Sequence, residues 1–211
     1  PLDIIFQGGL VSGRSYGSGA PYGRGKTILV GSISDNLNHS GEMHLVITVE
    51  TPPEDIEVRN AARHMQLNAT QITDGTNTHH RQFLQNIENY EQAIEDNTIY
   101  EYAPGIDIDG VIRLIRSHIY RNKIKGVIID YLQVIGGRER AQNTPDHLNS
   151  MGNRINALCR QEGIWSVIMV QAEEGRSQPE LDQIRKPLSI FVRMQRDPNE
   201  TGIIFITEKN N

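Results

Sequence analysis

A glycine-rich stretch that ends in Gly25-Lys26-Thr27 has the residue types and spacing of a phosphate-binding loop. Gly23 and Gly25 allow a backbone tight enough to direct successive N–H groups at phosphate oxygens. Lys26 supplies an ammonium for the β- and γ-phosphates, and the Thr27 hydroxyl is a hard oxygen ligand suited to Mg²⁺. A helix that starts here adds the positive end of its dipole. The residues predicted to bind a nucleoside triphosphate are Ala20, Pro21, Tyr22, Gly23, Arg24, Gly25, Lys26 and Thr27.

Two other interpretations of this stretch explain less of the chain. A dinucleotide-binding fingerprint would begin at Gly17 and Gly19, but its third glycine falls at Gly23, one position late, and it has no role for Lys26 or Thr27. A chance glycine-rich turn before a helix accounts for the glycines alone. Neither alternative explains the polar residues that end later apolar runs, so we favour the phosphate-binding interpretation.

Those polar residues are Glu50, Asp130 and Gln171, and each follows an apolar run of strand length. Ligands of a parallel sheet bind at the carboxyl ends of its strands, so we expect all three beside the phosphate loop. Asp130 is predicted to hold Mg²⁺ through its waters. Glu50 is predicted to orient or deprotonate the attacking water. Gln171 is predicted to contact the γ-phosphate and to report its loss to the following loop.

Strand-like runs alternate with segments of helical periodicity along the chain. The runs lie at 14–19, 43–50, 98–103, 125–130, 165–170, 188–194 and 202–207, of which the first has poor β-propensity. Segments 68–80 and 172–187 read as polar connectors. The alternation predicts a single α/β domain with a mostly parallel central sheet flanked by helices.

Two helix starts are predicted in detail. The helix after the phosphate loop is expected to bury Ile28, Leu29, Ile33 and Leu37 on one face. The next helix is expected to begin with Thr51 as its N-cap, followed by proline in the first turn.

Composition narrows the class of protein. The 211 residues carry a formal net charge of -5, so no global basic field indicates nucleic acid, although basic groups could still line the channel of a ring. The single cysteine, Cys159, excludes an intramolecular disulfide and fits a reducing, cytoplasmic compartment. No apolar run approaches the roughly 20 residues that span a bilayer, so no membrane association is expected.

The run Val127-Ile-Ile-Asp-Tyr-Leu-Gln-Val-Ile-Gly-Gly137 looks like the Walker B strand of the family of DnaB-type hexameric replicative helicases. Residues 8–27 resemble its entry segment, Val49-Glu50-Thr51 resembles the segment with its catalytic glutamate, and Val170-Gln171-Ala172 resembles its sensor glutamine. The likeness covers most of the chain.

The resemblance implies a RecA-like P-loop ATPase over residues 1–211, without the family's amino-terminal primase-interacting domain. Its cofactors would be ATP and Mg²⁺, bound between subunits of a homo-hexamer that translocates 5′→3′ on single-stranded DNA and unwinds duplex DNA. Primase and a helicase loader would be further partners. The DNA-facing loops would be about 136–145 and 172–187. Their basic residues, the candidate DNA contacts, are Arg138, Arg140, Arg176, Arg185 and Lys186.

The chain departs from the family pattern in two places. Lys209 fits the lysine of a Lys-x-Arg that reaches the γ-phosphate of the adjacent subunit, but Asn211 stands at the arginine position. Segment 172–187 is also shorter than the family norm. Two alternatives therefore stay open: a RecA/RadA-like recombinase, and a non-motor regulatory or loader ATPase of the same fold, which the acidic net charge and the missing arginine favour.

Overall fold

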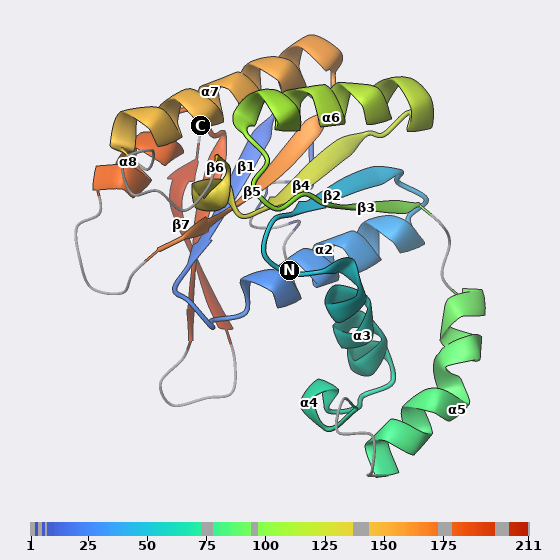
Figure 1. Ribbon diagram of the computed structural model, residues 1–211. Helices are drawn as coiled ribbons and strands as arrows, with labels where there is room; N and C mark the ends of the chain where they lie inside the picture. Colours follow the sequence, from blue (N-terminus) through green and yellow to red (C-terminus); the bar gives the residue numbers. More distant parts are fainter. Residues whose placement is uncertain are drawn as a thin grey trace.

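In the computed structural model, one mixed sheet forms the centre of the molecule (Figure 1). The structure describes Asp3, Phe6 and residues 8–72, 78–93, 97–136, 144–172, 179–196 and 203–210. Within these residues seven strands follow the order β3-β2-β4-β5-β1-β6-β7, and only the β6–β7 pair is antiparallel. The strands are β1 (Ser15–Ala20), β2 (His44–Thr48), β3 (Thr98–Tyr102), β4 (Gly126–Asp130), β5 (Trp165–Gln171), β6 (Ile190–Arg196) and β7 (Ile203–Asn210).

Helices cover both faces of the sheet. They are α2 (Lys26–His39), α3 (Pro53–His64), α4 (Ala69–Ile72), α5 (Thr78–Ala93), α6 (Ile108–Asn122), α7 (Pro145–Glu162) and α8 (Pro179–Arg185), with a 3-10 turn η1 (Leu132–Val134). Figure 1 shows α6 and α7 side by side over one face and α2 on the other, while α5 stands away from the sheet beyond α3. Each face has its own apolar cluster, which includes Ile115 and Ile155 on the α6–α7 side and Leu29 and Ile33 on the α2 side.

Packing, rather than propensity, explains why β1 is a strand. All six of its residues are buried, and the two glycines lie under the ring of Phe191. A side-chain carbon added to Gly17 or Gly19 would come within 2.7 Å of that ring, which is closer than carbon atoms pack. The strand predicted at 14–19 is observed one residue later, at Ser15–Ala20. Its poor β-propensity comes from the two glycines, which leave room for the ring of Phe191.

Three local predictions were wrong. Ile28 is 53% exposed, because it lies five positions and so about 140° around α2 from the buried Ile33. The N-cap of α3 is Pro52 and not Thr51. Both polar connectors contain helix: α4 and the start of α5 fall within 68–80, and α8 falls within 172–187. The four-residue α4 and the seven-residue α8 are too short to show a helical period in the sequence, and only the first three residues of α5 fall within 68–80.

Candidate active site

The predicted polar residues meet at the carboxyl edge of the sheet. The phosphate loop follows β1, Glu50 comes two residues after β2, and Asp130 and Gln171 end β4 and β5. The strand register places Thr48 opposite Asp130 and Ala20 opposite Gln171. Parallel pairing therefore brings residues that are far apart in the sequence to one edge, as the sequence predicts.

The loop has the left-handed turns that its glycines allow. Gly23 and Gly25 have φ angles of 69° and 89°, and Gly25 is the residue from which α2 begins. Lys26 is 9% exposed, and its ammonium donates to the backbone carbonyls of Ala20 and Pro21, both at 3.2 Å. Burial lowers the pKa of Lys26, and the carboxylates of Asp130 and Glu50 oppose this shift. The lysine is thus already bound to its own loop.

An oxygen pair lies directly beside this lysine. The Thr27 hydroxyl donates to Asp130 Oδ2 over 3.1 Å, and the Asp130 side chain is buried. Burial raises the pKa of Asp130, and the opposing effects of the Thr27 hydrogen bond and of the nearby Lys26 charge are smaller. A buried carboxylate and a hydroxyl at hydrogen-bond distance form the oxygen donor set that Mg²⁺ prefers, so these residues fit the metal.

A cavity of about 490 Å³ opens over these groups. Glu50 and Thr51 enter it from the segment after β2, and Tyr131 enters from the residue after β4. The lining residues are Tyr22, Gly23, Gly25, Lys26, Thr27, Ile28, Glu50, Thr51, Arg59, Asp130 and Tyr131. Sequence reasoning missed Arg59 and Tyr131. Arg59 lies nine residues after Glu50 on α3, and because the same helix also carries Arg63, no pattern in the sequence singles Arg59 out.

Gln171 is absent from the described lining of this cavity. Its backbone is instead held by Gln133, which donates to Gln171 O at 2.8 Å and accepts from Gln171 N at 3.1 Å. The next residue, Ala172, donates its amide to Ala20 O at the start of the phosphate loop over 2.9 Å. The end of β5 is therefore connected both to η1 after the Asp130 strand and to the phosphate loop.

The family model described as "DnaB-like helicase C terminal domain" matches residues 2–190. The chain belongs to this family. Family membership confirms the predicted resemblance and identifies the chain as an ATP-hydrolysing helicase motor domain. A comparison with curated proteins finds no match.

Two solved structures share the fold of this DnaB-like domain. One, described as an ATPase domain, has a TM-score of 0.80 at 15% identity and covers 99% of this chain and 81% of its own. The other is a DnaB-like replicative helicase described together with its interactions with primase; it also has a TM-score of 0.80 at 15% identity, over 99% of this chain and 55% of its own. The DnaB-like domain thus spans about half the length of the second structure. These likenesses confirm the RecA-like α/β fold.

The remaining predicted contacts of the DnaB-like domain are only partly visible. Arg138, Arg140 and Arg176 lie outside the described residues. Arg185 forms ion pairs with Glu208 and Asp182, whereas Lys186 is exposed and donates to Gln183. The backbone of Lys209 lies in β7, while its side chain is outside the described part of the structure. Their DNA and nucleotide contacts stay predictions.

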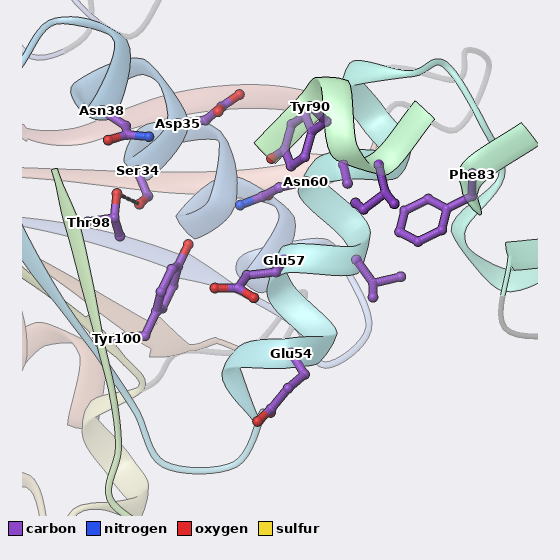
Figure 2. Close-up of a pocket in the computed structure, with 13 residues that line it drawn as sticks. Ser34, Asp35, Asn38, Glu54, Glu57, Asn60, Phe83, Tyr90, Thr98 and Tyr100 are labelled. Carbon is purple, nitrogen blue, oxygen red and sulfur yellow. Dashed lines mark hydrogen bonds between the residues drawn. The ribbon is translucent and has the colours of Figure 1, made fainter. Parts of the chain in front are cut away.

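A second cavity, of about 480 Å³, lies between α2, α3, α5 and β3. Figure 2 shows carboxylates from Asp35, Glu54 and Glu57 around it, with Tyr90 and Tyr100 among them. Burial raises the pKa of Tyr90 to about 12. An acidic lining repels a triphosphate, so the cavity at the carboxyl edge is the better nucleotide site although the two volumes are similar.

No helix within the described ranges is long and apolar enough to cross a bilayer.

Proposed function

We propose that the cavity over Lys26 binds and hydrolyses ATP, and that this reaction drives movement of the helicase along single-stranded DNA. The observation that carries the proposal is the meeting of Lys26, Thr27, Glu50 and Asp130 at one cavity from three separate strand ends. A lysine, a hydroxyl and two carboxylates supply the groups that phosphoryl transfer to water requires.

We propose that the Lys26 ammonium changes its hydrogen-bond acceptors when phosphate binds. The ammonium that now donates to Ala20 O and Pro21 O turns to the β- and γ-phosphates, and the amides around Gly23 and Gly25 donate to the remaining oxygens. Thr27 and Asp130 would hold Mg²⁺, which when bound neutralises charge on the phosphates. Because Asp130 is buried, ionising its carboxyl costs free energy, and a cation bound in this site would offset that cost.

Glu50 is the proposed base for the attacking water. It is exposed at the cavity wall and follows β2 closely, so its backbone is fixed while its carboxylate reaches the solvent. Arg59 lines the same cavity and is proposed to stabilise negative charge on the phosphates as the bond to the leaving group breaks. Gln171 is proposed as a relay rather than a direct contact, because Gln133 of η1 holds its backbone and the next residue, Ala172, donates to the phosphate loop.

The wider activity follows the family resemblance and is part of the same proposal. It comprises assembly into a homo-hexamer, 5′→3′ translocation, duplex unwinding, and primase and loader as partners, in a cytoplasmic setting. The solved helicase described with its interactions with primase supports the primase partner. Lys209 is proposed to act on the nucleotide of a neighbouring subunit, because the antiparallel β7 places it opposite Phe191, near the start of β6 and away from the carboxyl edge that carries the phosphate loop.

The proposal is tested by ATP hydrolysis with and without single-stranded DNA. Lys26→Ala should abolish ATP binding and hydrolysis. Glu50→Gln should keep ATP binding but slow hydrolysis by about 10²–10⁴-fold, the usual contribution of a general base. Lys125→Ala is the matched control, since Lys125 is exposed just before β4 at the opposite edge of the sheet. Hydrolysis at the normal rate by Lys26→Ala would refute the site. Nucleotide-independent DNA affinity would instead favour the regulatory alternative, and filaments in place of rings would favour the recombinase.

A further inference from the structure

The side chain of Glu208 in β7 is held between two arginines. Its carboxylate forms ion pairs with Arg185 of α8 and, at 2.7 Å, with Arg193 Nε of β6. The exposed fractions of the three side chains are 18%, 21% and 20% for Glu208, Arg185 and Arg193. Because these charges are largely withdrawn from water and the carboxylate is bound on both sides, its position is fixed more firmly than in an exposed ion pair.

The arginine from α8 stands on a rigid base. The Arg185 guanidinium lies over the Phe191 ring, 5.1 Å from the ring centroid, and Phe191 is fully buried. The same ring packs over Gly17 and Gly19 of β1, the strand that leads into the phosphate loop. Glu208 is therefore joined, through Arg185 and Phe191, to the strand that carries the phosphate loop.

The pairing of β6 with β7 is irregular at Glu208. Thr207 pairs with Val192, and Lys209 pairs with Phe191. The register therefore skips Glu208, the extra residue of a β-bulge. In an unbroken ladder Glu208 would stand opposite Phe191, and the backbone of Lys209 would lie one position further along. Bulges recur beside active sites, where they change the direction of a neighbouring residue, so this one sets the register position of Lys209.

We propose that Glu208 is the positioning residue for Lys209. Its ion pairs hold the bulge, and the bulge fixes the register at which the Lys209 backbone is presented to the adjacent subunit. Arg185, a candidate DNA contact from the sequence, serves here to hold Glu208 in place. This inference rests on the proposed function, because it explains how Lys209 is placed for its proposed action on a neighbouring subunit's nucleotide.

The test measures steady-state ATP hydrolysis by the full chain with Mg²⁺, ATP binding by calorimetry, and assembly by light scattering. Glu208→Gln keeps the size of the side chain but removes its charge. Its kcat should fall about 10²-fold, the loss that a displacement of about 1 Å can cause, while ATP affinity and assembly stay unchanged. Glu208→Asp keeps the charge and should lose less. Asp182→Asn is the matched control, because it removes the other carboxylate paired with Arg185 and should leave kcat unchanged.

A double variant separates positioning from a general effect on the fold. If Glu208 acts only through Lys209, Glu208→Gln combined with Lys209→Ala should hydrolyse ATP at the rate of Lys209→Ala alone. A further fall in the double variant would overturn the inference, as would unchanged kcat, weaker ATP binding or lost assembly in Glu208→Gln. A wild-type rate in Lys209→Ala would also overturn it but would leave the phosphate site intact. Hydrolysis that survives in Lys26→Ala would refute the proposed function itself, and the inference with it.

Discussion

Replacing the buried carboxylate of Asp130 by an amide should stabilise the protein while it destroys nucleotide binding. Burial raises the pKa of Asp130 despite the Thr27 hydrogen bond and the Lys26 charge, so ionising this carboxyl costs more free energy in the folded state than in the unfolded chain. Asp130→Asn is a neutral isostere whose amide oxygen can still accept from Thr27. We expect the free energy of unfolding at pH 7.5, without nucleotide or Mg²⁺, to rise by about 1–2 kcal/mol.

Thermal unfolding measures this change directly. For a chain of this length the gain corresponds to a rise in Tm of about 2–8 °C. The stability penalty of a carboxyl whose folded pKa is raised builds up as the pH rises from its unfolded pKa, about 4, to its folded pKa, so the advantage of Asp130→Asn should shrink as the pH falls toward 4. Saturating Mg²⁺ and ATP should reverse the order, because ligand at 100 times its Kd stabilises the wild type by about 2.7 kcal/mol. A less stable Asp130→Asn, or an advantage independent of pH, would refute the reasoning.

Two further predictions concern groups outside the cavity. Gln133→Ala removes both hydrogen bonds to the Gln171 backbone and should lower the free energy of unfolding by about 2 kcal/mol, with Gln133→Glu, which keeps only the acceptor, intermediate; a Tm equal to that of the wild type would contradict this. Burial lowers the pKa of His44, whose ring bonds to Ser34 Oγ at 2.8 Å, so the unfolded state takes up a proton near pH 6.5 before the folded state does. Stability should therefore fall as the pH drops below about 6.5. In His44→Asn, the free energy of unfolding, measured by urea titration at each pH, should fall less steeply with pH in that range.

The parts of the site that the sequence predicts are those carried by local runs. Gly25-Lys26-Thr27 is contiguous, and Asp130 follows an apolar strand directly, so each is visible without knowledge of the fold. The α/β class and parallel sheet follow from the same alternation of runs. Family membership confirms the helicase prediction, while the individual roles of Glu50 and Gln171 stay predictions.

What the sequence could not predict depends on contacts between distant residues. Arg59 reaches the cavity only because α3 packs beside the phosphate loop, and its own segment resembles any polar helix face. The two hydrogen bonds between the Gln133 side chain and the Gln171 backbone join residues 38 positions apart, and neither residue lies in a sequence pattern that requires the other. Ile28 was misplaced because an isoleucine in an amphipathic helix normally faces the core, whereas here it lines the cavity.

The position of β1 in the sheet has a consequence for synthesis of the chain. Its two partners are β5 and β6, so Ser15 pairs with Ser166 and Tyr16 with Ile190. A ribosome releases the amino-terminal strand long before either partner exists, and the glycines of that strand give it little tendency to order alone. The phosphate loop is consequently ordered among the last parts of the domain. A nascent chain truncated before residue 165 lacks both partner strands of β1 and should not bind nucleotide.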